Sequence, residues 1–260
     1  MKMKKYSVGI DLGSRMSKIV ILDSKSIIYS DVKDTGVNPK NTAKQLFERA
    51  LSKLKISENE IINIFSTGYG RNIVPFADKR ITEISCHAKG VNFLFPDART
   101  VIDIGGQDSK AILLDSNGKV TDFMMNDRCA AGTGRFLEVV ANILELTVNE
   151  MSRISACGNV ELEINSTCVV FAESEIVGLI SQGKKPIEII YAVHRSVAKR
   201  ILNLISQLHW KEPVVFTGGV AKNKGMQKAI SSALKTEIII PENPLITGAL
   251  GAAIFASEDL

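Results

Sequence analysis

A repeated motif constrains the fold of this chain more than any other feature of the sequence. Residues 11–23 read DLGSRMSKIVILD and residues 103–115 read DIGGQDSKAILLD, so identical residues recur at six matching positions 92 residues apart. Each copy follows an apolar, β-rich run and precedes another short one, which predicts strand, tight turn, strand, turn, strand and then helix. Two such units predict a duplicated α/β architecture with a cleft between similar lobes.

The duplication also suggests the domain boundaries. We expect an N-terminal lobe over residues 1–96 and a C-terminal lobe over residues 97–244, with a C-terminal helix over residues 245–260 that packs back on the first lobe. No low-complexity linker separates the two halves, so packed elements should join them.

Composition excludes several classes of partner. The chain has 260 residues, of which 45% are hydrophobic and 23% charged, as in an ordinary globular protein. Its 32 basic and 28 acidic residues are spread along the sequence, whereas a nucleic-acid or membrane surface needs clustered basic residues. No apolar run approaches the roughly 18 residues of a membrane span. We therefore expect a cytoplasmic protein that binds neither nucleic acid nor membrane.

Glycine turns after strands predict a nucleotide site. Their backbone N–H groups can hold phosphate oxygens, and Asp11 and Asp103 at the strand ends are placed to hold a hydrated Mg²⁺ ion. Lys18 should return along its hairpin toward the phosphates. For Lys110, a solvent-facing or lobe-bridging role is an equal alternative. The stretch FTGGVAKN at residues 216–223 is a third glycine turn, suited to close approach by a base and ribose.

These three turns together resemble the acetate and sugar kinase, Hsp70 and actin superfamily. The resemblance implies a duplicated actin-like (ribonuclease H-like) ATPase fold, with two lobes around a nucleotide cleft that binds ATP or ADP and Mg²⁺. Asp11 and Asp103 would be catalytic. Gln107 and Asp108 are candidates to position the attacking water, although a structural turn role for Asp108 stays open. The nucleotide-binding residues would be Gly13, Ser14, Arg15, Met16, Ser17, Lys18, Gly105, Gly106, Gln107, Gly132, Gly218, Gly219, Lys222 and Asn223.

One departure from the superfamily pattern lies in the first loop. Arg15 and Met16 stand where smaller residues are expected, which leaves the phosphate contacts of that loop open.

Four further stretches carry a closer resemblance. STGYGRN (66–72), DIGGQDSK (103–110), MNDRCAAGTGRFLE (125–138) and STCVVFAESE (166–175) resemble the activator ATPases (component A) of 2-hydroxyacyl-CoA dehydratases, in the BadF/BadG/BcrA/BcrD ATPase family. This resemblance implies a homodimer with one 4Fe–4S cluster shared between its subunits. Such a dimer takes an electron from ferredoxin or flavodoxin and, with ATP hydrolysis, passes it to the dehydratase subunits.

The cysteines fit that implication. Cys129 and Cys168 each immediately precede a predicted helix, whose positive end stabilises a thiolate, whereas Cys86 lies inside a helical run and Cys157 in a loop. A cubane cluster needs four thiolates, so two ligands from each of two chains would complete it. We therefore expect Cys129 and Cys168 to be the metal ligands.

Three alternatives remain at the level of the sequence. They are a small-molecule (sugar or carboxylate) kinase of the same superfamily, the ATPase subunit of a benzoyl-CoA reductase-type system, and a non-catalytic actin-like assembly module. The chain lacks the extra length that normally builds a kinase substrate domain. The dehydratase and the electron donor are not encoded in these residues.

Overall fold

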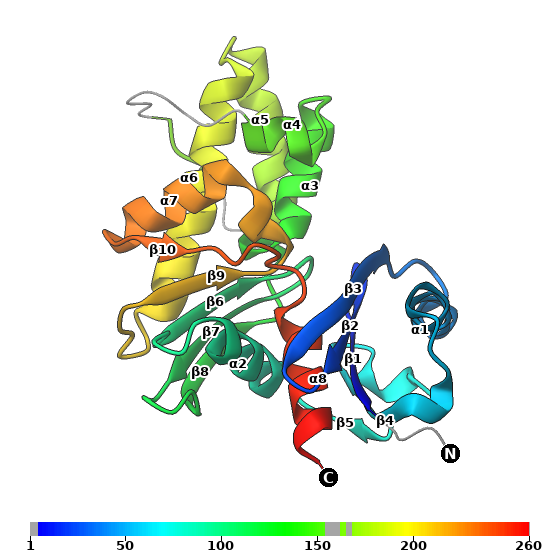
Figure 1. The fold of residues 1–260 in the computed structure, drawn as a ribbon. Helices are drawn as coiled ribbons and strands as arrows, with labels where there is room; N and C mark the ends of the chain where they lie inside the picture. Colours follow the sequence, from blue (N-terminus) through cyan, green and yellow to red (C-terminus); the bar gives the residue numbers. More distant parts are fainter. Residues whose placement is uncertain (1–4, 154–161, 165–167, 260) are drawn as a thin grey trace. The chain divides into compact units, whose positions relative to one another are not determined.

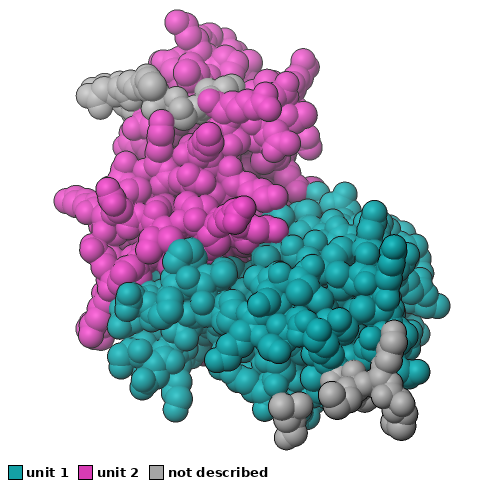
Figure 2. All heavy atoms as spheres, in the orientation of Figure 1, with its two compact units in different colours: residues 1–101, 114–121, 245–260 teal, residues 102–113, 122–244 magenta. Residues whose placement is uncertain are grey.

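The structure, a computed structural model, describes residues 5–153, 162–164 and 168–259. Cys157 lies outside the described residues. The chain divides into two compact units, residues 1–101, 114–121 and 245–260 in the first and residues 102–113 and 122–244 in the second (Figure 2). The chain has two sheets of five strands; the first lies within the first unit, and the second draws most of its residues from the second unit.

The two sheets have the same strand order, which confirms the duplication predicted from the repeat. The first contains β1 (Tyr6–Leu12), β2 (Met16–Asp23), β3 (Ser26–Asp34), β4 (Ile61–Thr67) and β5 (Lys79–Arg80), in the order β3-β2-β1-β4-β5. The second contains β6 (Thr100–Ile104), β7 (Ser109–Leu114), β8 (Val120–Asn126), β9 (Val214–Thr217) and β10 (Ile238–Ile239), in the order β10-β9-β6-β7-β8. In both, the first strand of the unit lies at the centre, beside its hairpin partner and the fourth strand.

Helices cover both faces of the first sheet (Figure 1). The helices of this unit are α1 (Pro39–Leu54), α2 (Glu83–Leu94) and α8 (Thr247–Glu258). Helix α1 buries Leu46 and Phe47 against one face, and α8 buries Leu250 and Ala253 against the other, which carries Val20. Because β1 and β2 are covered on both sides, they read as apolar runs rather than as alternating strands.

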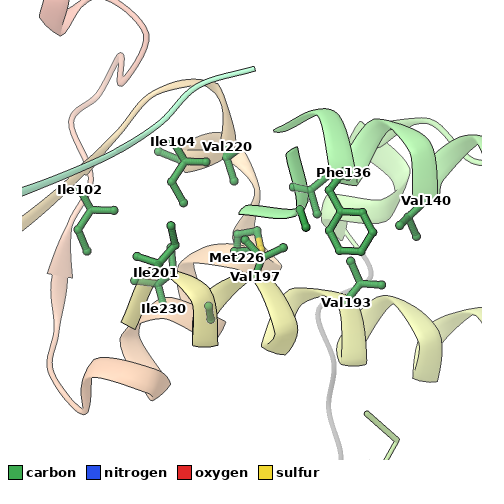
Figure 3. Packing of buried hydrophobic residues seen from close by; sticks show 14 of the residues in the cluster. Ile102, Ile104, Phe136, Val140, Val193, Val197, Ile201, Val220, Met226 and Ile230 are labelled. Atoms are coloured by element: carbon green, nitrogen blue, oxygen red, sulfur yellow. The ribbon is translucent and has the colours of Figure 1, made fainter. Parts of the chain in front are cut away.

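The second unit has one larger core. Its helices are α3 (Gly134–Ile143), α4 (Val148–Arg153), α5 (Val169–Ser181), α6 (Pro186–Ile205) and α7 (Lys224–Leu234). Helix α6 presents Val193, Val197 and Ile201 at helical spacing, toward Phe136 of α3 and Ile102 of the sheet (Figure 3). Burying a side chain such as Phe136 contributes about 2 kcal/mol.

Short 3₁₀ turns complete the two units. They are η1 (Glu58–Glu60), η2 (Arg71–Ile73), η3 (Ala130–Gly132) and η4 (Gly219–Lys222). Within the described part of the chain, no helix combines the length and the apolar character needed to cross a membrane.

Candidate functional site

Asp11 lies near the end of β1 and is paired with Lys18 of β2. The antiparallel register places the two residues directly opposite each other, so their side chains share one face of the hairpin. The Nζ atom of Lys18 lies 2.8 Å from Oδ2 of Asp11, and both side chains are largely buried. A Cβ atom on Gly13 would lie 3.3 Å from the same Nζ atom. The lysine ammonium group therefore borders both the carboxylate and the glycine turn.

Hydroxyl groups hold the first phosphate loop together. Thr35 donates a hydrogen bond of 2.7 Å from Oγ1 to the carbonyl oxygen of Gly13, and Oγ of Ser17 lies 2.8 Å from Oγ1 of Thr35. Because Thr35 has one hydroxyl hydrogen, Ser17 is the donor in this second bond. The Ser17 hydroxyl, expected at the nucleotide, thus supports the loop from a fully buried position.

The larger residues of this loop are accommodated without disrupting the hairpin. Arg15 is exposed, and its carbonyl oxygen accepts a hydrogen bond of 2.9 Å from the Thr35 N–H group. Met16 begins β2 opposite Asp34, and Ser14 is half-buried. The backbone of the turn is therefore anchored to the end of β3, whatever the size of its side chains.

Two glycines and a histidine that the sequence reading missed surround Asp11. Gly68 has a φ of +91°, and a Cβ atom there would lie 2.4 Å from Oδ1 of Asp11. A Cβ atom on Gly248 would lie 3.1 Å from Oδ2 of Asp11 and 3.2 Å from Nε2 of His87. Nδ1 of His87 lies 3.0 Å from the Thr247 hydroxyl. A side chain at position 68 would clash with this carboxylate, which explains the first glycine of STGYGRN.

In the second unit, Asp103 is held by a threonine and a lysine. Thr217 donates a hydrogen bond of 2.8 Å to Oδ1 of Asp103. Nζ of Lys110 lies 3.6 Å from Oδ2 of Asp103 and 2.8 Å from Oδ2 of Asp108, and the Lys110 side chain is 2% exposed. Lys110 is therefore a buried cation between two carboxylates, so the structure excludes the solvent-facing alternative for it.

The second phosphate loop is bonded to the start of α3. The Gly134 N–H group donates to the carbonyl oxygen of Gly105, and the Arg135 N–H group donates to that of Gly106, both at 2.9 Å. The Gly105 N–H group donates to the carbonyl oxygen of Asp108 and closes the turn. Gln107, at the tip, is exposed. The loop and the first turn of α3 thus form one hydrogen-bonded unit.

The third glycine turn packs on β6. Gly218 has a φ of +86°, and a Cβ atom there would lie 2.3 Å from the carbonyl oxygen of Ile104. Gly219 and Lys222 are exposed, in keeping with a surface that a ligand can reach.

Asn223 differs from the expectation of an available nucleotide ligand. Its Oδ1 accepts a hydrogen bond from the Met226 N–H group at the start of α7, and its Nδ2 lies 3.3 Å from Nε2 of His194. The residue is 3% exposed. Its side chain therefore caps α7 and contacts a buried histidine.

The two candidate metal ligands differ in their local structure. Cys168 is the N-cap of α5, as predicted, and is exposed. Cys129 is half-buried and precedes only the 3₁₀ turn η3, while α3 begins at Gly134. The expectation of an α-helix directly after Cys129 is wrong because Thr133, with φ −132° and ψ 172°, is extended and separates the turn from the helix.

The remaining described cysteine is a core residue. Cys86 is fully buried in α2, and burial raises the pKa of its thiol to about 12. A thiolate is the form that binds metal, so Cys86 is unsuited to ligation.

Gly132, predicted at the nucleotide, is buried beside Asn126, and a Cβ atom there would lie 3.3 Å from Nδ2 of Asn126.

Known proteins resemble this chain along nearly its whole length. The chain is 48% identical over 254 residues to the activator of lactoyl-CoA dehydratase of Anaerotignum propionicum, covering 97% of this chain and 98% of that protein. It is 45% identical to the solved activator of the 2-hydroxyisocaproyl-CoA dehydratase from Clostridium difficile with bound ADPNP, with a TM-score of 0.91 over 98% of this chain and 95% of that one. The solved component A of (R)-2-hydroxyglutaryl-CoA dehydratase from Acidaminococcus fermentans is 42% identical, with a TM-score of 0.93 over 98% of both chains.

These similarities confirm the fold and the family. The two-lobed actin-like ATPase fold expected from the repeat is that of the matched structures. The model of the BadF/BadG/BcrA/BcrD ATPase family matches residues 8–256, which include both phosphate loops, both candidate cysteines and the third glycine turn. The chain therefore belongs to the BadF/BadG/BcrA/BcrD ATPase family.

Proposed function

We propose that this chain is the ATP-dependent activator of a 2-hydroxyacyl-CoA dehydratase. In this proposal, a homodimer with one shared 4Fe–4S cluster accepts an electron from ferredoxin or flavodoxin and, coupled to ATP hydrolysis, transfers it to the dehydratase subunits. Support comes from the activators named above, which the chain matches over nearly their full lengths.

The nucleotide would be held by the two repeated hairpins and the third glycine turn. Asp11 and Asp103 are the carboxylates that would hold Mg²⁺ through its waters, with Lys18 beside the first loop. Gln107 is exposed at the tip of the second loop and would position the attacking water. Asp108 is engaged by Lys110 at 2.8 Å, so we assign it to holding the turn.

The cysteine residues suit an iron–sulfur cluster in their chemistry and number. Cys129 and Cys168 both occupy the position before a helical turn, and neither side chain makes a capping hydrogen bond there. Among the three cysteines that the structure describes, Cys86 is buried with a raised thiol pKa, which leaves Cys129 and Cys168 as the proposed ligands. They would supply two thiolates per chain, and a cubane cluster needs four. A second copy of the chain would complete the set. When bound, the cluster supplies one-electron transfer.

An exposed apolar surface beside Cys168 supports the homodimer. Helix α5 starts directly after Cys168 and leaves Val170, Phe171, Val177 and Ile180 exposed. Val170, Val177 and Ile180 are spaced by seven and three residues and so lie on one face of the helix. Soluble monomers seldom expose large contiguous apolar surface, so a second subunit is the expected cover.

The observation that carries the proposal is the bonding of the second phosphate loop to α3. The carbonyl oxygens of Gly105 and Gly106 accept hydrogen bonds from the first turn of α3, and Cys129 lies in the turn just before it. A nucleotide-dependent shift of the loop would therefore move the segment that carries Cys129. ATP and ADP must favour different positions of the loop for this coupling to work.

Anaerobic iron and sulfide analysis tests the proposal. About two iron atoms per chain are expected, since four would be shared by two chains. Cys129→Ser and Cys168→Ser should each lose the iron and keep ATP binding, whereas retained iron would disprove the ligand assignment. About four iron atoms per chain would contradict a shared cluster, and the absence of iron would favour the kinase alternative. If iron is present, an assay of ATP-dependent activation of candidate dehydratases tests whether one of them is the partner.

A further inference from the structure

Asn126 binds both backbone groups of Cys129. Its Oδ1 accepts a hydrogen bond of 3.0 Å from the Cys129 N–H group, and its Nδ2 donates one of 2.8 Å to the Cys129 carbonyl oxygen. Asn126 is half-buried at the end of β8, so the sheet anchors this clamp. One side chain thus holds the cysteine on both sides of its Cα atom.

The two residues between Asn126 and Cys129 take no part in these two hydrogen bonds, which we call the Asn126 clamp. Asp127 and Arg128 loop out into solvent, with side chains 56% and 96% exposed, and their charged groups lie 4.0 Å apart. An ion pair this exposed contributes little to stability. The conformation of the turn therefore depends on Asn126 rather than on the residues that connect it to Cys129.

The end of the turn, at residues 132–134, is also held by packing and hydrogen bonds. Gly132 packs against the Asn126 amide, and the Thr133 hydroxyl donates a hydrogen bond of 2.8 Å to the Ala130 carbonyl oxygen. Gly134 is then bonded to the Gly105 carbonyl oxygen. The Cys129 turn is held at its start by Asn126 and at its end by the second phosphate loop.

From this arrangement we propose that Asn126 is a positioning residue for the Cys129 thiolate; the inference rests on the proposed function, in which Cys129 binds a cluster. With the Cys129 backbone fixed at φ −115° and ψ 107°, its Sγ atom is restricted to a few staggered positions. The clamp also occupies the Cys129 N–H group, a hydrogen-bond donor adjacent to the sulfur. Residues that orient metal ligands typically change metal affinity about 10- to 100-fold when they are replaced.

The test uses the full chain purified anaerobically with its iron and measures iron release to a chelator. Asn126→Ala removes both hydrogen bonds and should release iron about 10- to 100-fold faster than the wild type. Asn126→Asp keeps the acceptor but sets a carboxylate oxygen against the Cys129 carbonyl oxygen, and should be intermediate. Asp127→Ala, in the same turn but outside the clamp, is the matched control and should release iron at the wild-type rate.

Mg·ATP binding and thermal unfolding on the same samples separate positioning from folding. Mg·ATP binding should match the wild type in Asn126→Ala, and thermal unfolding should show that the variant is folded at the temperature of the iron assay. A general structural role would impair both. Wild-type iron release in Asn126→Ala would overturn the inference, as would equal acceleration in Asp127→Ala. If Asn126→Ala does not fold, iron release from Asn126→Asp is the deciding measurement. A wild-type rate of iron release in that variant would overturn the inference.

A failure of the proposed function can be distinguished from a failure of this inference. Iron retained by Cys129→Ser would disprove Cys129 as a ligand and remove the basis for the clamp. Iron lost from Cys129→Ser together with wild-type release from Asn126→Ala would refute the role of Asn126 alone.

Discussion

Thr217 donates a hydrogen bond of 2.8 Å to Oδ1 of Asp103, and both residues are buried, 0% and 3% exposed. Thr217 directly precedes Gly218 of the third glycine turn, whereas Asp103 lies two residues before Gly105 of the second phosphate loop. Because Thr217 occupies Oδ1, it fixes the rotation of a carboxylate that we assign to Mg²⁺.

Thr217→Val should therefore weaken ATP hydrolysis. The variant keeps the shape of the side chain but leaves a buried carboxylate oxygen without this donor, which costs about 1–3 kcal/mol. We expect kcat/KM for ATP to fall about tenfold or more, measured as phosphate release. Thr217→Ser keeps the hydroxyl and is the control; equal kcat/KM in the two variants would contradict a role for the hydrogen bond.

Lys18→Gln should destabilise the first unit. The lysine is the 2.8 Å partner of Asp11 in a pair that is largely buried, and removing one partner of a buried pair costs about 3 kcal/mol. Urea unfolding measures the loss. Lys44→Gln is the control, because Lys44 pairs with Glu48 at 3.5 Å on an exposed helix surface and should change stability by less than about 1 kcal/mol. Comparable losses in both variants would refute the prediction.

Gly68→Ala should impair ATP binding through Asp11. Its positive φ costs an alanine about 1–2 kcal/mol, and the added Cβ atom would also press on Oδ1 of Asp11 from 2.4 Å. Gly36→Ala is matched, with φ +63° and no atom within 4 Å of the added Cβ atom. Isothermal titration with Mg·ATP should find binding lost only in Gly68→Ala. Wild-type affinity in that variant would show that the carboxylate tolerates displacement.

Acidification should unfold the protein partly through His194. Burial lowers the pKa of this imidazole to about 4, below its ordinary value of about 6.5. The unfolded chain then takes up the proton first, so the free energy of unfolding falls as the pH drops from about 6.5 to 4, by up to about 3 kcal/mol.

His194→Gln should remove this part of the pH dependence. The glutamine cannot titrate, so the free energy of unfolding should fall less steeply between those pH values than in the wild type. Urea titrations at several pH values measure the slope. His209→Gln changes an exposed histidine and should leave the slope unchanged; a wild-type slope in His194→Gln would contradict the assignment.

Removing the iron of the proposed cluster should make the cysteines reactive in a fixed order. Cys168 is exposed and Cys129 half-buried, whereas Cys86 is fully buried. After anaerobic chelation, iodoacetamide should modify Cys168 first and Cys129 next, because the reagent reaches the more exposed thiol sooner. Cys86 should react only on unfolding, because it is buried and its thiol pKa is raised. Mass spectrometry of peptides follows the three sites. Modification of Cys168 at the same rate before and after chelation would contradict ligation.

Local sequence features were enough to predict the two hairpins. Because β1 and β2 are joined by a short turn, their register follows from the spacing, and a lysine seven residues after an aspartate comes to lie opposite it. The apolar runs likewise predicted the first three strands of each sheet, and a helix was expected directly after Cys168, where α5 begins. These features depend on neighbours in the chain, so no knowledge of the fold was needed.

Tertiary structure alone decided which groups surround the predicted residues. Thr217 reaches Asp103 from 114 positions away, and Gly68 and Gly248 reach Asp11 only because their strand and helix pack beside β1. The break at Thr133, which moved α3 away from Cys129, depends on hydrogen bonds to Gly105 and Gly106. The sequence determined the hairpins, the loops and the residue types they carry, since these follow from local spacing and backbone sterics. The partners of each carboxylate and cysteine depended on packing between distant segments, which no local pattern encodes.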